Sequence, residues 1–224
     1  MFRQLKQWLI PRRCLPSPWD TEKWLNIPFL SVDLELTSLD VAKSNILSVG
    51  WVQARYNRIF LESCHYQVIK TKGSLHQSPV IHGLIAQDVA SGSKVVNMLE
   101  ALMPYAQTHV WVIHNTQLDL AVLHKAFKSL QIAVPAIVTV DTLQLEVYLL
   151  KKHSPVLAPN AATLSSCRQN HDLPFAPAHN ALDDALATIE LLYAQLNQLD
   201  PLNNATLQDF TYTGAIKVFA ERAI

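Results

Sequence analysis

Three β-rich segments follow one another directly between residues 28 and 70, and this order restricts the fold more than any other feature of the sequence. Each segment holds β-branched or aromatic residues in partial alternation, and the short connections carry Asp, Lys, Ser and Asn. Strands joined by short connections pair antiparallel, so we expect a three-strand antiparallel meander. The segments read PFLSVDLEL, NILSVGWVQARY and RIFLESCHYQVIK.

From residue 84 onward, helical spacing alternates with short apolar runs. Strands that alternate with helices pair in parallel, which predicts an α/β domain with a mixed central sheet and flanking helices. The last helix, over HNALDDALATIELLYAQLNQL, has the most regular apolar spacing. The other segments are LIAQDVASGSKVVNMLEALMPYAQ and TQLDLAVLHKAFKSLQ as helices, HVWVIHN as a strand, AIVTVDTLQLEVYLLKK as a strand running into a helix, and a helix over NAATLSSCRQNH.

The 224 residues, half of them hydrophobic, suit one compact core better than two. We expect an N-terminal amphipathic arm over residues 1–27, a main domain over 28–200 and a C-terminal tail over 201–224 that packs on the domain. Apolar residues at 2, 5, 8 and 9 predict a short helix in the arm, ended by Pro11. We find no apolar run long enough for a membrane helix and no signal peptide, and we predict no membrane partner.

The formal net charge is zero, so long-range attraction does not mark the chain as a binder of nucleic acid. A nucleic-acid substrate would have to be held by local basic groups or by metal ions. The three cysteines, Cys14, Cys64 and Cys167, are widely spaced and form no CxxC pair, which argues against a disulfide framework. A reducing, cytoplasmic location is therefore expected.

Two acids, Asp33 and Glu35, interrupt the first apolar strand in FLSVDLELTS. Residues two apart on a strand point to the same face, so both carboxylates project together. Like charges this close repel unless a cation lies between them. Clustered carboxylates are more typical ligands of Mg²⁺ or Mn²⁺ than of zinc. Taken alone, however, this pair is explained equally well as two solvated acids at an exposed strand end.

Further acids stand where other elements begin. Asp119 falls in the first turn of a helix after HVWVIH, and Asp184 falls near the start of the last helix, five residues after His179. In α/β domains, strand ends and helix N-termini are where sites assemble. Neighbouring acids have structural explanations: Asp183 points elsewhere around its helix, and Asp141 is expected to cap one.

In their order and spacing these segments resemble the three motifs of the DnaQ-like, or DEDDh, 3′-to-5′ exonucleases. The motifs are D-x-E on the first strand, HNxxxD in the middle, and H-x-x-x-x-D near the end. VIHGL (80–84) and VDTLQL (140–145) resemble connecting segments of the family, and the resemblance covers roughly residues 28–197. It implies a ribonuclease H-like exonuclease fold.

The resemblance also implies roles for five residues. Asp33, Glu35 and Asp184 would ligate two Mg²⁺ or Mn²⁺ ions, with Asp33 bridging them, while Asp119 would act through coordinated water. Two ions about 4 Å apart activate the attacking water and stabilise the leaving 3′-oxygen. His179 would be the general base, and the product would be a nucleoside 5′-monophosphate.

Where the family continues from D-x-E with T-T-G, this chain has Leu36, Thr37 and Ser38. Because family members bring the backbone near that glycine against the terminal nucleotide, Ser38 affects the fit of the substrate but not the metal site. Leu39 falls at the position where the family places an apolar wedge against the terminal bases. For His82 and Asn115 the alternative is a structural role in shaping a turn. The predicted substrate contacts are Leu36, Thr37, Ser38, Leu39, His82 and Asn115.

The function implied is metal-dependent 3′-to-5′ exonuclease activity on a nucleic acid with a free 3′ end, with DNA preferred, of the proofreading or repair type. One alternative is an exoribonuclease of the RNase T or oligoribonuclease type, since no residue here is assigned to the RNA 2′-hydroxyl. Another is a non-catalytic module, against which the complete set of acids argues. A DNA polymerase or sliding clamp is a further candidate partner, through a faint clamp-like QLDPL at 198–202.

Overall fold

A six-stranded mixed sheet forms the centre of the computed structural model, which describes residues 15–71, 84–177 and 179–220. The strand order is β3-β2-β1-β4-β5-β6. Strands β1, β2 and β3 pair antiparallel, β4 and β5 lie parallel to β1, and β6 is antiparallel to β5. The predicted three-strand meander and the mixed α/β sheet are both confirmed.

The strands are β1 (Phe29–Leu36), β2 (Ile46–Arg55), β3 (Arg58–Val68), β4 (Val110–Ile113), β5 (Ile137–Asp141) and β6 (Ile216–Phe219). The α-helices are α2 (Ala86–Ser91), α3 (Val95–Leu102), α4 (Thr116–Ser129), α5 (Thr142–Lys151), α6 (Leu164–Asn170) and α7 (Ala181–Leu199). The 3₁₀ turns are η2 (Trp24–Asn26), η3 (Met103–Tyr105) and η4 (Gln208–Thr213).

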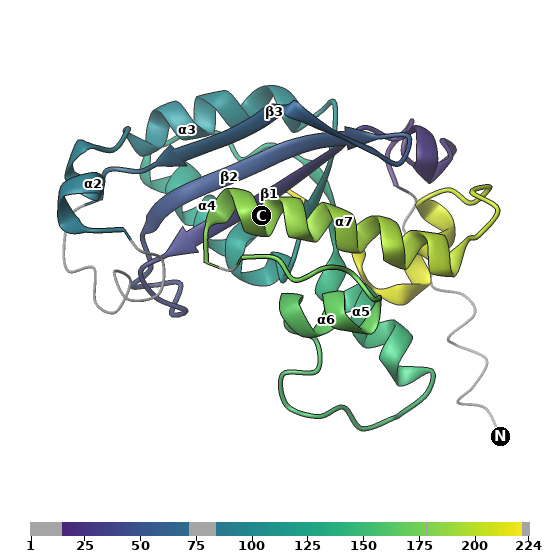
Figure 1. Cartoon of the computed structure of the whole chain (residues 1–224). Helices are drawn as coiled ribbons and strands as arrows, with labels where there is room; N and C mark the ends of the chain where they lie inside the picture. The colour runs from purple at the N-terminus through teal and green to yellow at the C-terminus, as the bar shows by residue number, and fades with distance from the viewer. Residues whose placement is uncertain (1–14, 72–83, 178, 221–224) are drawn as a thin grey trace, which may run out of the picture.

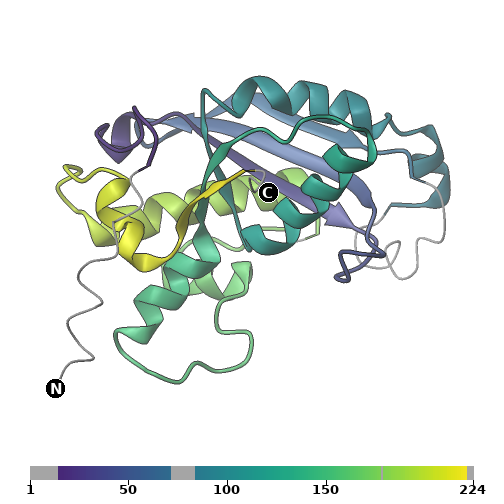
Figure 2. The ribbon, with the colours of Figure 1, turned by 180° about the vertical axis from the view of Figure 1, so that it is seen from behind.

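Helices cover both faces of the sheet. Helix α7 crosses the face toward the viewer in Figure 1, where alternate residues of the strands pack with its apolar side. Helices α3 and α4 cover the opposite face, seen in Figure 2. Alternate residues of one strand therefore enter different cores: Phe29 packs on the α7 side, whereas Leu30 and Val32 pack on the α3 and α4 side.

The two ends of the described chain meet on the α7 side of the sheet. Leu15, Trp19 and Trp24 are buried in the same core as Phe210 of η4 and Ile216 of β6. The Trp24 indole N–H also donates to the Asp200 carboxylate at 3.0 Å. The division into an arm, a domain and a tail stays a proposal, and the amphipathic helix predicted near residues 2–10 lies outside the described residues.

Candidate active site

Three carboxylates from two elements converge at the end of β1. Ligand oxygens of Asp33, Glu35 and Asp184 all lie within 4.8 Å of one another. Asp33 and Glu35 come from β1, two residues apart on one face, and Asp184 comes from the first turn of α7. Glu35 is buried, and Asp33 and Asp184 are partly buried. The structure therefore brings together the three acids to which the resemblance assigns the metal-ligand role, although Asp184 lies about 150 residues further along the chain than the other two.

The first turns of helix α7 pack closely against β1 and β2 because two small residues, Ser31 and Gly50, lie beneath them. Gly50 on β2 is the register partner of Asp33, and a Cβ placed there would overlap the backbone of Ala181 and Leu182. The buried Ser31 hydroxyl donates to the Ala185 carbonyl at 2.7 Å. A glycine within a strand often marks such a close backbone approach, and this one was the available sequence signal.

For the exonuclease activity that the sequence resemblance implies, Gly50→Ala is therefore expected to lower kcat about a hundredfold, because a displacement of about 1 Å in a reacting group has that effect. The added methyl group pushes the start of α7, and Asp184 with it, away from Asp33. Gly214→Ala is the control: Gly214 has a φ of 77° before β6, so the substitution strains the backbone far from the site. Full activity of the purified Gly50→Ala protein would contradict this account.

Asp119 lies buried in the first turn of α4, where it raises the negative charge at the same end of the sheet. Burial raises the pKa of Asp119 to about 8, against hydrogen bonds from its own N–H and that of Leu34. Burial, followed by the charges of Asp119, Asp184 and Glu35, raises the pKa of Asp33 well above its ordinary value. Burial likewise raises the pKa of Asp184 to about 6.

This donor set fits hard divalent cations. Its ligand atoms are all carboxylate oxygens. A bound cation would relieve the repulsion between these negatively charged groups. No sulfur or imidazole ligand belongs to this group of three, so the chemistry of the donors favours Mg²⁺ or Mn²⁺ over zinc.

The raised pKa of Asp119 predicts how stability changes with pH in the metal-free protein. Since the folded state holds this proton more tightly than the unfolded chain, the carboxyl's stabilising contribution is present below its ordinary pKa of 3.8 and is lost as the pH rises toward about 8. Thermal unfolding in EDTA should therefore show the stability of the Asp119→Asn variant rising relative to that of the wild type between about pH 4 and pH 8. Excess Mg²⁺ should reduce that gain, and a difference that does not vary with pH would refute the assignment.

His179 stands at the rim of the carboxylate group on the segment that enters α7. Its backbone N–H donates to Asp184 Oδ2 at 3.0 Å, and its φ of 69° is in the left-handed region that non-glycine residues seldom adopt. Asn180 is the N-cap of α7, accepting from the N–H groups of Leu182 and Asp183. The exposed histidine side chain is thus tied through its own backbone to one of the carboxylates.

A cleft of about 750 Å³ opens over these groups. It lies between the start of α4, the end of β1 and the α5–α6 loop (residues 152–163), which projects below the sheet in Figure 1. Asp33, Asp119, Asp184 and His179 all line it, so four of the five residues to which the resemblance assigns catalytic roles line one cavity. Glu35 does not line the cleft but belongs to the carboxylate group with Asp33 and Asp184.

The predicted substrate contacts divide into two sets. Leu39, which is 83% exposed, and Asn115 line the cleft. Leu36 packs against the core, the Thr37 hydroxyl accepts from the Asn45 N–H, and the Ser38 hydroxyl accepts from the Asp40 N–H. The side chains of residues 36–38 are therefore engaged by the loop itself, and the substrate role of these three stays a prediction. His82 lies outside the described residues.

The loop that carries Leu39 is held by Lys125 of α4. Its ammonium donates to the carbonyls of Val41, Ala42 and Ser44 at 3.2, 2.9 and 2.8 Å. Hydrogen bonds from a charged donor are stronger than those between neutral groups, so this lysine fixes the loop against the helix that bears Asp119. The sequence offered no local signal for this contact, because the partners are 81 to 84 residues apart.

Asp141 joins the two turns that shape the floor of the cleft. As expected, it caps α5 by accepting from the N–H groups of Leu143 and Gln144. It also accepts from the N–H groups of Asn115 and Thr116. The β4–α4 turn, in which Asn115 adopts a left-handed φ of 73°, is thus fixed by the same carboxylate that starts α5.

His114, the residue after β4, contacts two other segments of the chain. One ring nitrogen lies 2.9 Å from the Thr142 hydroxyl and the other lies 3.0 Å from the Ala162 carbonyl. Burial lowers the pKa of this imidazole, which favours the neutral ring. His114 therefore connects the α5–α6 loop, one wall of the cleft, to the sheet.

The class of protein defined by this sheet and site is that of the exonucleases. The family model described as Exonuclease (RNase_T) matches residues 30–192, so the chain belongs to this family of nucleic-acid hydrolases. The predicted membership among DnaQ-like 3′-to-5′ exonucleases, with a ribonuclease H-like fold, is confirmed.

Particular relatives agree with this family. The chain is 27% identical over 184 residues to the 3′-5′ exonuclease DinG of Staphylococcus aureus (strain MRSA252), covering 81% of this chain but 19% of that protein. It therefore spans about a fifth of the length of the curated relatives it matches. Cell-death related nuclease 4 has the same fold, with a TM-score of 0.68, 14% identity and coverage of 88% of this chain and 82% of that one. Exonuclease X, solved with 5′ overhanging duplex DNA, gives a TM-score of 0.60, 17% identity and coverage of 83% and 99%.

No helix in the described ranges is long and apolar enough to cross a membrane.

Proposed function

We propose that this chain is a divalent-metal-dependent 3′-to-5′ exonuclease that releases nucleoside 5′-monophosphates one at a time from the 3′ end of DNA. The observation that carries the proposal is the convergence of Asp33, Glu35 and Asp184 within 4.8 Å at the floor of a cleft that Asp119 and His179 also line. These are the residues to which the resemblance to the DnaQ-like exonucleases assigns the metal ligands and the general base.

In this proposal Asp33, Glu35 and Asp184 would hold two Mg²⁺ or Mn²⁺ ions, and Asp119 would act through water. When bound, such ions supply Lewis-acid activation of the nucleophile and charge stabilisation of the leaving oxygen. His179 accepts the proton of the attacking water, and its backbone bond to Asp184 keeps the imidazole at the rim of the carboxylate group. Leu39 and Asn115 contact the terminal nucleoside in the cleft.

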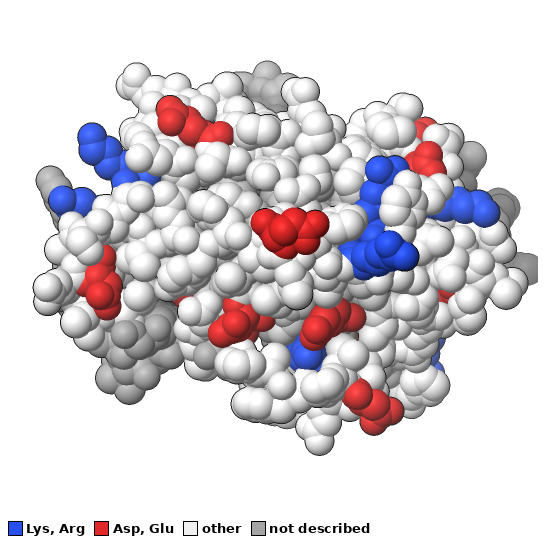
Figure 3. All heavy atoms as spheres, turned by 45° about the horizontal axis from the view of Figure 1, so that its top comes forward, with Lys and Arg blue, Asp and Glu red and all other residues white. Residues whose placement is uncertain are grey.

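DNA is the substrate we favour, and its phosphates are held by the ions more than by surface charge. On the face seen in Figure 3, acidic and basic side chains are interspersed and no basic stripe crosses the described residues drawn there. The net charge of the chain is zero. In most nucleic-acid interfaces Lys and Arg supply the phosphate contacts. Since no basic stripe is seen among the described residues of this face, a bound strand needs the metal ions for affinity as well as for chemistry.

The proposed partner is a nucleic acid with a free 3′ end. The proposed location of the protein is the cytoplasm. A reducing compartment suits the two described cysteines, which are unpaired. Binding of a sliding clamp through QLDPL would require rearrangement of a folded segment. Gln198 and Leu199 belong to α7, and the Asp200 carboxylate binds the Trp24 indole and the Ala205 N–H. A pull-down against polymerase and clamp would test these partners.

A time course on 5′-labelled single-stranded DNA, duplex DNA and RNA tests this function. We expect a ladder of products that shorten by one nucleotide in Mg²⁺ or Mn²⁺, nucleoside 5′-monophosphates in solution, and no shortening in EDTA. Faster loss of DNA than of RNA supports the favoured substrate, and the reverse order assigns the chain to the exoribonucleases. Intact substrates in both metals would refute the proposal.

A further inference from the structure

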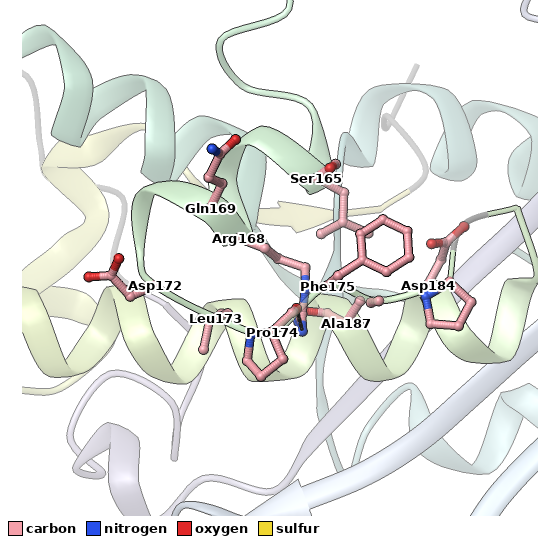
Figure 4. A pocket seen from close by; sticks show the side chains of 12 residues that line it. Ser165, Arg168, Gln169, Asp172, Leu173, Pro174, Phe175, Asp184 and Ala187 are labelled. Carbon is pink, nitrogen blue, oxygen red and sulfur yellow. Dashed lines mark hydrogen bonds between the residues drawn. The ribbon is translucent and has the colours of Figure 1, made fainter.

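A second hollow lies beside the cleft, and Asp184 lines both. It encloses about 400 Å³ between α6, the segment 172–177 and the first turns of α7. Figure 4 shows Phe175, Ser165 and Asp184 toward one end of this hollow and Asp172 toward the other. This volume falls in the range of about 300 to 1,000 Å³ that is usual for small-ligand sites.

The charges of the hollow argue against a phosphate as its ligand. Its lining contains one cation, Arg168, whose two terminal nitrogens are already engaged. One terminal nitrogen donates to the Ala187 carbonyl at 2.9 Å and lies 2.7 Å from Glu190, and the other donates to the Pro174 carbonyl at 2.8 Å. Asp172 and Asp184 add negative charge to the lining. A neutral group therefore suits this hollow better than an anion.

The hollow presents the chemistry that recognises a nucleobase. The Phe175 side chain is 88% exposed, although burial of an aromatic ring is strongly favourable. The bond from Arg168 to the neighbouring Pro174 holds the segment in place. Nearby, the exposed Ser165 hydroxyl and Gln169 amide make no hydrogen bond with any other residue in the described ranges. An aromatic face with adaptable polar groups beside it is how proteins bind unpaired bases.

The position of the hollow indicates which base. A phosphodiester bound at Asp184 has one nucleoside on each side, and the cleft with Leu39 takes the terminal one. We propose that the hollow takes the base of the nucleotide next to the 3′ end, stacked on Phe175. This inference rests on the proposed function and adds a second base-binding position to it. The enzyme would then grip two successive nucleotides around the bond it cuts.

The test is a double comparison of protein and substrate. kcat/KM is measured for strands with thymine or an abasic sugar at the second position from the 3′ end, with wild type and Phe175→Ala. Stacking energies predict that the wild type prefers the base about tenfold and that the variant loses most of that preference. Phe175→Tyr should restore the preference. The preference for a base at the terminal position should be the same in all three proteins.

Val156→Ala is the matched control, because Val156 is 83% exposed, lies in the α5–α6 loop and lines neither cavity. An unchanged preference in Phe175→Ala, or an equal loss at both nucleotide positions, would overturn the proposal. The same strands with a non-hydrolysable 3′-terminal phosphonate linkage, followed by fluorescence anisotropy, report the base site without cleavage. A wild type that discriminates the phosphonate strands by anisotropy but hydrolyses none of the corresponding phosphodiester strands would refute the proposed function and leave the base site supported.

Discussion

Asp33→Asn is expected to lower phosphodiester hydrolysis at least about a thousandfold, since charge stabilisation by bound ions contributes several kcal/mol. The substitution keeps the size of the side chain and removes the carboxylate that lies among Asp119, Asp184 and Glu35. The same change should raise the thermal stability of the metal-free protein, because burial and three neighbouring charges disfavour an ionised group there. Lower activity combined with higher stability separates a site residue from a structural one.

Asp183→Asn is the matched control for this prediction. It removes one negative charge from the first turn of α7, next to Asp184, from a side chain that does not belong to the group of three. Rates are to be measured at saturating Mn²⁺, and unfolding is to be followed in EDTA by circular dichroism. If the Asp33→Asn protein kept more than about a tenth of the wild-type rate, a role for Asp33 in holding the ions would be excluded.

His179→Ala is expected to lower kcat about a thousandfold, within the range usual for loss of a general base, with little effect on binding of a strand. The reason is the separation of roles within the site: the backbone N–H of His179 binds Asp184, and any residue supplies that N–H, whereas only the imidazole accepts a proton. Added imidazole should restore part of the rate by replacing the missing ring. Single-turnover rates and anisotropy with a labelled strand give the two quantities separately.

His153→Ala is the corresponding control, because His153 is an exposed histidine just after α5 that does not line the cleft. If His179→Ala weakened strand binding as strongly as it lowered the rate, the side chain would be a substrate contact rather than a base. If His179→Ala lowered kcat less than about tenfold, His179 would not be the general base.

The sequence predicted the features that depend on local spacing. The strand at Phe29–Leu36, the helix at Ala181–Leu199 and the Asp141 cap follow from periodicity and from side-chain chemistry within a few residues. The candidate site residues were accessible for the same reason, because each stands at a recognisable strand end or helix start. The order of the motifs then indicated the family.

The features that escaped prediction depend on contacts between distant segments. Strand β6 pairs with β5 at the sheet edge, yet residues 216–219 form a run of only four residues, which is short for a strand prediction from alternation alone. The overlap that a Cβ on Gly50 would make with α7 depends on where a helix 130 residues later crosses the sheet. Arg168 has the sequence context of an ordinary charged residue of α6, and only the packing of α7 brings its guanidinium to the Ala187 and Pro174 carbonyls. Such partners are chosen by the tertiary fold and not by local propensity.

Calorimetric titration of the metal-free protein with Mn²⁺ tests the central claim most directly. The account predicts that the wild type and Asp183→Asn bind Mn²⁺ alike, and that Asp184→Asn binds it at least about tenfold more weakly, because a ligand carboxylate is lost. Binding should also strengthen as the pH rises, since the pKa of Asp184 is raised to about 6 and that of Asp119 to about 8, and protons compete for both carboxylates. Equal Mn²⁺ affinity in the wild type and Asp184→Asn would contradict the claim that Asp33, Glu35 and Asp184 form one metal site.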